Sequence, residues 1–92
     1  LSKDDRLRGY IIERIMCDLS VDLSAVCKKF TIPKETFYPE IEKLKPLSED
    51  GIINLLNNTI TVTEIGRPFV RLVAAAFDAY LDSGKGRHSR AV

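Results

Sequence analysis

The residues best suited to bind another molecule are arginines near the C-terminal end of the chain. Arg67 and Arg71 lie four positions apart in an apolar stretch, so on a helix both would project from one side. Arg90 stands in a terminal stretch rich in glycine, lysine and arginine that contains no acidic residue after position 82. Because a guanidinium matches an anion with paired N–H donors, this end of the chain predicts an anionic partner.

The same arginines allow a plainer interpretation. Arginines on a helix surface are commonly solvated or paired with a nearby carboxylate, and Asp78 lies seven residues after Arg71 on the same side. The spacing alone leaves two alternatives open. Either Arg67 and Arg71 bind a ligand, or they pair with Asp78 or tie this domain to a neighbouring one.

The two cysteines predict neither a metal site nor thiol catalysis. Cys17 and Cys27 each lie in a helical apolar pattern, which predicts two buried, reduced thiols in a cytoplasmic protein. Iron–sulfur and structural zinc sites need about three or four ligands, and the chain has two cysteines. A cysteine nucleophile needs a positioned histidine base, and His88 lies in the glycine-rich tail. We therefore expect no catalytic residue, metal or cofactor site in this chain.

Length and composition predict one globular domain. The chain has 92 residues, 45% of them hydrophobic and 29% charged, with a net charge of +1, so its overall charge does not indicate a nucleic-acid partner. No apolar run approaches the roughly 20 residues that cross a bilayer, which predicts no membrane association. Because the chain begins with Leu1 rather than methionine, we expect it to be a fragment of a longer protein.

Three helices are predicted before residue 51. Ser2 with Asp5 forms a capping box for the first helix. Asp22 caps a second helix that ends near residue 30, and Pro46 is expected to kink or shorten the third. Apolar residues at helical spacing predict the core positions: Leu7, Ile11 and Ile15, widened by Tyr10, Ile12, Met16 and Leu19, and then Phe37, Ile41 and Leu44.

A hairpin and a final helix follow. The β-branched runs 52–56 and 59–62 flank Asn57-Asn58, a pair typical of a turn with positive φ angles. Helical spacing then predicts a long helix beginning near Gly66, with these residues facing inward: Ile65, Phe69, Leu72, Val73, Ala76 and Tyr80. The fold class is mainly α with a small β-hairpin. Its order of three helices, wing hairpin and long C-terminal helix is winged-helix-like, with the domain at 1–82 and a flexible basic tail at 83–92.

Winged helices commonly bind DNA, but the charges here disfavour it. Residues 33–50, which include the helix that would enter the major groove, hold three lysines against five acidic residues. The wing, residues 55–62, has no lysine or arginine, whereas DNA affinity depends largely on neutralised phosphates. A fold reused as a packing or protein-interaction module is the better-supported interpretation.

Taken together, several motifs resemble one family nearly end to end. The sequence is similar to the C-terminal domain of bacterial oxygen-independent coproporphyrinogen III oxidases, which are radical S-adenosylmethionine enzymes of haem biosynthesis. The motifs that carry the resemblance are Asp4-Asp5-x-x-Arg8, Leu47-x-x-Asp50-Gly51-Ile52-Ile53, Val62-Thr63-x-x-Gly66-Arg67-x-x-Val70-Arg71, Phe77-Asp78-x-Tyr80-Leu81 and Ser89-Arg90-Ala91-Val92. One departure is His88, where the family usually has an aromatic residue. Related haem-chaperone proteins share a similar domain and remain an alternative parent.

The resemblance implies a function for the parent enzyme. In that family a [4Fe-4S] cluster and S-adenosylmethionine, held by an N-terminal barrel with a CxxxCxxC motif, convert two propionates of a tetracarboxylate porphyrinogen into vinyl groups. This chain lacks that motif, so the cofactors would lie outside it and the fragment alone would be inactive. The resemblance also implies that the domain packs on the barrel and helps enclose the substrate. Arg67, Arg71 and Arg90 are then the candidate partners of the substrate carboxylates.

Overall fold

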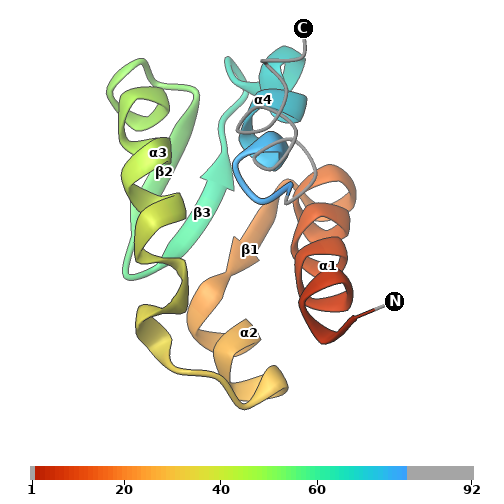
Figure 1. Ribbon diagram of the computed structural model, residues 1–92. Helices are drawn as coiled ribbons and strands as arrows, with labels where there is room; N and C mark the ends of the chain where they lie inside the picture. The colour runs from red at the N-terminus through yellow and green to blue at the C-terminus, as the bar shows by residue number, and fades with distance from the viewer. Residues whose placement is uncertain (1, 79–92) are drawn as a thin grey trace, which may run out of the picture.

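Helices and strands interleave along residues 2–78, the part of the chain that the computed structural model describes (Figure 1). The elements are α1 (Lys3–Asp18), β1 (Ser20–Asp22), α2 (Leu23–Phe30), the 3₁₀ turn η1 (Lys34–Phe37), α3 (Tyr38–Glu49), β2 (Ile53–Leu56), β3 (Thr59–Val62), the 3₁₀ turn η2 (Arg67–Phe69) and α4 (Val70–Ala75). This order confirms the mainly helical fold with a small β-hairpin. The tail predicted at 83–92 lies outside the described residues.

The sheet has three antiparallel strands, in the order β1-β3-β2, where the sequence predicted two. In the predicted hairpin, Ile53 pairs with Val62, and both turn residues adopt positive φ, 52° for Asn57 and 65° for Asn58. The added strand β1 pairs Val21 with Ile60. Three residues are too short for an alternating pattern to be recognised, so the sequence offered no signal for β1. The likeness to winged helices remains a prediction.

Local signals set the beginnings of the first two helices. Ser2 and Asp5 form the predicted capping box of α1, and the Asp5 amide donates to the Ser2 hydroxyl over 3.0 Å. The Asp22 carboxylate accepts hydrogen bonds from the amides of Ser24 and Ala25, so β1 leads directly into a capped α2. Both caps were predicted from the residue types alone.

The third helix passes through Pro46 to Glu49, so the prediction that this proline shortens the last turn is wrong, while a kink at Pro46 stays a prediction. A proline removes its own N–H and its ring crowds the carbonyl four residues earlier, but its own carbonyl still accepts a hydrogen bond. Here the Pro46 carbonyl accepts from the Asp50 amide over 3.0 Å. Gly51, at φ 80°, follows the end of the helix and precedes β2.

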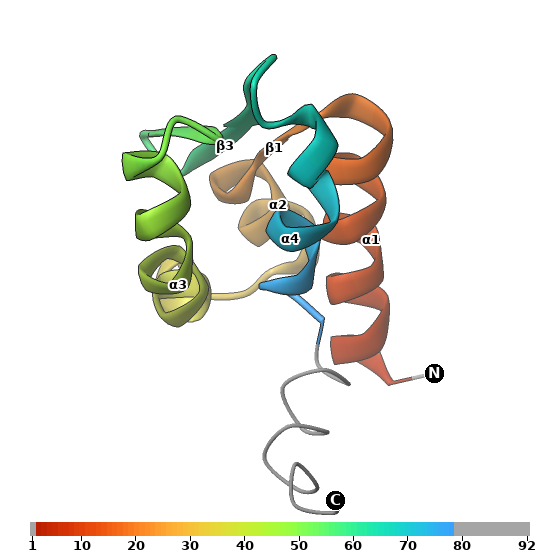
Figure 2. The ribbon, with the colours of Figure 1, turned by 90° about the horizontal axis from the view of Figure 1, so that it is seen from above.

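Two outer helices enclose the remaining elements. In both views α1 and α3 lie on opposite sides of the molecule, with α2 and α4 between them (Figures 1 and 2). The core between them is apolar, and the rings of Phe37 and Phe77 meet edge to face with centroids 5.8 Å apart. Its largest fully buried side chains are Phe37, Phe77, Ile11, Ile15, Leu44, Ile53, Ile60 and Val73. The predicted stripes of the first and third helices therefore supply much of this core.

The segment after the sheet differs most from the prediction. Instead of one long helix from Gly66, the chain forms η2 and then the six-residue α4, after which Phe77 and Asp78 continue in i→i+3 turns. Pro68 lies in η2, where its missing N–H and fixed φ favour the short 3₁₀ turn. The predicted inward residue Tyr80 lies outside the described residues.

Candidate functional site

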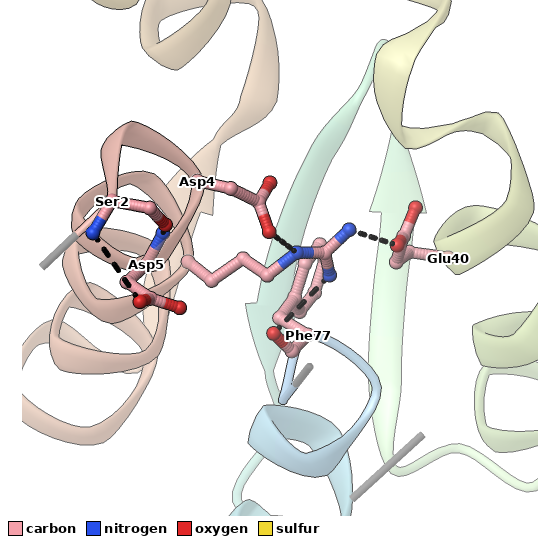
Figure 3. A network of polar contacts seen from close by, with 6 residues as sticks. Ser2, Asp4, Asp5, Glu40 and Phe77 are labelled. Carbon is pink, nitrogen blue, oxygen red and sulfur yellow. Dashed lines mark hydrogen bonds and ion pairs between the residues drawn. The ribbon is translucent and has the colours of Figure 1, made fainter. Parts of the chain in front are cut away.

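A buried ion pair joins the first and third helices at the end of the fourth. The Arg8 guanidinium on α1 donates from Nη2 to Glu40 Oε2 on α3 over 3.0 Å. Its Nε donates to Asp4 Oδ2 over 3.1 Å, and its Nη1 donates to the Phe77 carbonyl over 3.3 Å (Figure 3). All three nitrogens of one guanidinium are thus engaged by three separate parts of the chain.

The electrostatic environment of the Arg8–Glu40 pair keeps Arg8 charged. Glu40 is the one charged residue that is fully buried within residues 2–78, with 5% of its surface exposed. Burial by itself lowers the pKa of Arg8, but the hydrogen bond and charge of Glu40, with those of Asp4, outweigh it and raise the pKa above its usual value. Arg8 therefore stays charged, as the buried carboxylate requires. The second carboxylate oxygen of Glu40, Oε1, has no hydrogen-bond partner within the described part of the chain.

Sequence reasoning did not identify this pair, although it named Arg8 as part of a family motif. The missed signal was Glu40, which stands three residues after Phe37 and four before Leu44, on the inward stripe of a helix. A charged residue at such a position predicts a buried partner, because an isolated carboxylate is rarely buried. What the sequence could not reveal is which of fourteen lysines and arginines supplies that partner.

The structure places the predicted arginines on the surface and does not gather them into one site. Arg67 in η2 and Arg71 in α4 are both exposed. Arg71 lines a shallow hollow of about 280 Å³ between α1 and α4, and Arg67 does not. Its lining residues are Ile12, Met16, Arg71, Ala74, Ala75 and Asp78. Arg90 lies outside the described residues.

The alternative in which Arg67 or Arg71 pairs with Asp78 is not seen among residues 2–78, although Asp78 itself is not without a partner. Arg71 and Asp78 line the same hollow, yet within residues 2–78 neither Arg67 nor Arg71 forms an ion pair with another described side chain.

The Thr63-x-x-Gly66 motif next to Arg67 fastens the last helical segment to the sheet. The Thr63 hydroxyl donates to the Gly51 carbonyl over 2.6 Å and accepts from the Gly66 amide over 3.0 Å. A side chain at Gly66 would meet the backbone of Ile52, because a Cβ there would lie 2.0 Å from the Ile52 carbonyl oxygen. This close approach requires glycine, so the motif has a structural role.

The two cysteines differ, and only one matches the prediction of burial. Cys27 is buried, and its thiol donates to the Pro33 carbonyl over 3.4 Å. Burial raises the pKa of this thiol, and the negative charge of Glu35 raises it further. Cys17 is exposed and free, so its predicted burial is wrong, because it lies outside the stripe that α1 turns toward the core.

The residues of this chain do not fit an iron–sulfur cluster. Residues 2–78 contain no group of three or more histidine, cysteine, aspartate and glutamate side chains that could hold a metal ion. The whole sequence has two cysteines, whereas a [4Fe-4S] cluster is commonly held by four thiolates. These residues therefore do not supply the ligands that such a cluster needs.

Comparison with known proteins identifies the domain. The model of the HemN C-terminal domain family matches residues 1–69. The chain belongs to this family. Over all 92 residues it is 49% identical to the oxygen-independent coproporphyrinogen III oxidase of Bradyrhizobium diazoefficiens, and over 91 residues it is 37% identical to that of Helicobacter pylori strain 26695. These matches cover 100% and 98% of the chain but 20% of each relative.

A solved structure gives the same result for the fold. The HemN C-terminal domain described here superposes on coproporphyrinogen III oxidase (HemN) from Escherichia coli, a radical SAM enzyme, with a TM-score of 0.81 and 28% identity. The superposition covers 87% of this chain and 19% of that one. The chain therefore corresponds to the C-terminal part of such oxidases and spans about a fifth of their length. None of the helices in the described range is long and apolar enough to cross a membrane.

Proposed function

We propose that this chain is the C-terminal domain of a cytoplasmic oxygen-independent coproporphyrinogen III oxidase. Such an enzyme would convert coproporphyrinogen III to protoporphyrinogen IX by oxidative decarboxylation of two propionates. The observation that carries the proposal is 49% identity to an oxidase of this name over the entire chain. The S-adenosylmethionine and [4Fe-4S] cluster of the parent enzyme would be held upstream, in the N-terminal radical domain.

The proposed contribution of this domain is to pack on the radical domain and help enclose the substrate. In support, its buried polar groups serve the fold, since Glu40 is paired with Arg8 and the Thr63 hydroxyl ties the last segment to the sheet. The polar groups on the surface of the domain differ from the buried ones, because Arg67 and Arg71 are exposed cations. This division suits a domain that binds and covers a substrate whose reaction depends on groups elsewhere.

Within this proposal, Arg67, Arg71 and Arg90 are candidate partners of the substrate carboxylates. A porphyrinogen with four carboxylates presents several acceptors, and a guanidinium donates two parallel hydrogen bonds to one carboxylate. A hydrogen bond to a charged group contributes roughly 1.5–3 kcal/mol, so one lost contact should be measurable.

The test uses the full-length protein with Arg67→Gln, Arg71→Gln and Arg90→Gln made singly. Losing a carboxylate partner should weaken binding of coproporphyrinogen by roughly tenfold or more, at about 1.4 kcal/mol per decade. Arg6→Gln is the matched control, because Arg6 is an exposed arginine on α1 outside the segment that carries the candidates. Equal affinity in all three variants and the wild type would contradict the carboxylate role. A stability loss at unchanged affinity would instead favour a role in the domain interface.

A further inference from the structure

The segment from the β3 exit into α4 is more apolar than its own domain requires. Inside, Val73 and Phe77 are fully buried. Outside, Ile65 is 72% exposed, Phe69 45% and Leu72 55%. A helical segment that is apolar on several sides is typical of one that is buried on several sides.

These three residues stand out among the exposed hydrophobic side chains of the described structure. Six large hydrophobic residues are exposed within residues 2–78, and three of them come from the eight positions 65–72. Single exposed hydrophobic residues are normal on a protein surface, whereas a concentration marks an interaction site. Phe69 is the last residue of η2 and the N-cap of α4, and Leu72 lies three positions later in the first turn of α4, with Ile65 in the turn before η2. We call Ile65, Phe69 and Leu72 the apolar stripe.

The core of the domain does not explain why these positions are apolar. Their spacing predicted that all three would face inward, and that prediction is wrong. For Ile65 and Phe69 the reason is that the regular helix begins only at Val70, so the uninterrupted helix that would turn them inward is absent. Leu72 lies within α4, where the next residue, Val73, faces the core instead. The arginines beside them suit an interface too, because arginine and aromatic residues are enriched in the centres of interfaces.

We infer that the apolar stripe is the docking surface for the upstream radical domain of the same polypeptide. This inference rests on the proposed function. Since the chain corresponds to the C-terminal part of relatives five times its length, about four fifths of such a protein precedes it. That upstream chain joins at the start of α1, and α1 packs against α4, whose first turn lies beside the C-terminal half of α1 (Figure 2). The upstream domain is thus tethered about one length of α1, or roughly 24 Å, from the stripe, and a domain about four times as large as this one can span that distance.

The first measurement is hydroxyl-radical footprinting of the wild-type full-length protein. Phe69 and Leu72 should be oxidised several-fold more slowly than their exposure in this domain would allow. Leu56, at the end of β2 and 71% exposed, is the internal reference and should be oxidised readily. Oxidation of the stripe at the rate its exposure predicts would overturn the inference. Protection that disappears on dilution would overturn it as well, because the cover would then be a second copy of the protein.

The second measurement compares the double variant Phe69→Ser/Leu72→Ser with Leu56→Ser, both in the full-length protein. Loss of two interface side chains should raise the rate of proteolysis in the chain N-terminal to Ser2 roughly tenfold. The reason is that the cleavage rate follows the fraction of molecules in which the two domains have separated. The Leu56→Ser variant should be cleaved like the wild type. Equal cleavage of all three proteins would contradict the docking surface.

The oxidase assay separates this inference from the proposed function. A wild-type protein that decarboxylates coproporphyrinogen while its stripe is freely oxidised would refute the docking surface alone. A protein whose stripe is protected but which lacks that activity would refute the proposed oxidase and leave the interface in place.

Discussion

Arginines occupy two contrasting regions of this domain. Arg8 is mostly buried, and its three nitrogens donate to Asp4, Glu40 and the Phe77 carbonyl. Arg67 and Arg71, on the last helical segment, are exposed and form no ion pair within the described residues. All three lie in the motifs that carry the resemblance to the family. The contrast teaches that burial and pairing separate an arginine that stabilises the fold from one that is exposed to solvent.

The substitution with the largest expected effect is Arg8→Met, which tests whether the buried arginine stabilises the fold. Removing the guanidinium leaves Glu40 buried without a partner, which should lower the free energy of unfolding by about 3 kcal/mol or more. Chemical denaturation of the 92-residue chain measures the loss. The matched control is Asp4→Asn, because the Asp4 side chain is 58% exposed and its pairing with Arg8 should contribute at most about 1 kcal/mol. Similar stabilities for Arg8→Met and the wild type would show that the pair is dispensable for folding.

Gly66→Ala tests whether the residue directly before Arg67 serves the fold. The added Cβ would collide with the Ile52 backbone, so either the last segment or the sheet must shift. We expect a loss of about 1–3 kcal/mol, the usual range for overpacking. Gly9→Ala is the control, and its expected effect on stability has the opposite sign. A Cβ added at Gly9, on α1, would have no neighbouring atom within 4 Å. It should stabilise the domain by roughly 0.5–1 kcal/mol. A neutral Gly66→Ala variant would contradict the structural role of the motif.

The smallest effect concerns the thiols, which repeat the contrast between buried and exposed groups. Iodoacetamide should modify Cys17 well before Cys27, because Cys17 is exposed and burial raises the pKa of the Cys27 thiol. Mass spectrometry of a time course measures both rates. Equal rates would contradict the burial of Cys27.

The raised pKa of Cys27 also predicts a pH dependence of stability. The folded state favours the protonated thiol, so its contribution is complete below the unfolded pKa of about 8.5 and is lost as the pH rises through the higher folded pKa. The wild type should therefore lose part of its stability advantage over Cys27→Ala above that pH. Denaturation of both proteins on either side of it is the measurement, and a constant difference would contradict the shift.

Sequence alone determined most of the secondary structure, because the deciding signals are local. Ser2 with Asp5 and Asp22 cap their helices through hydrogen bonds that span two or three residues. Asn57-Asn58 forms the predicted turn since these residues tolerate positive φ. The stripe of Leu7, Ile11 and Ile15 is buried because helical periodicity alone puts the three on one face.

Only the tertiary structure decided the features that depend on distant neighbours. The pairing of Arg8 with Glu40 joins residues 32 positions apart, and periodicity cannot say which cation meets a buried carboxylate. Strand β1 exists because β3 offers it hydrogen bonds, not because three residues prefer to be extended. The spacing of the apolar residues at 65, 69 and 72 predicts core positions, yet their side chains are exposed. An apolar side chain carries no information about which surface will cover it, since the hydrophobic effect has no direction.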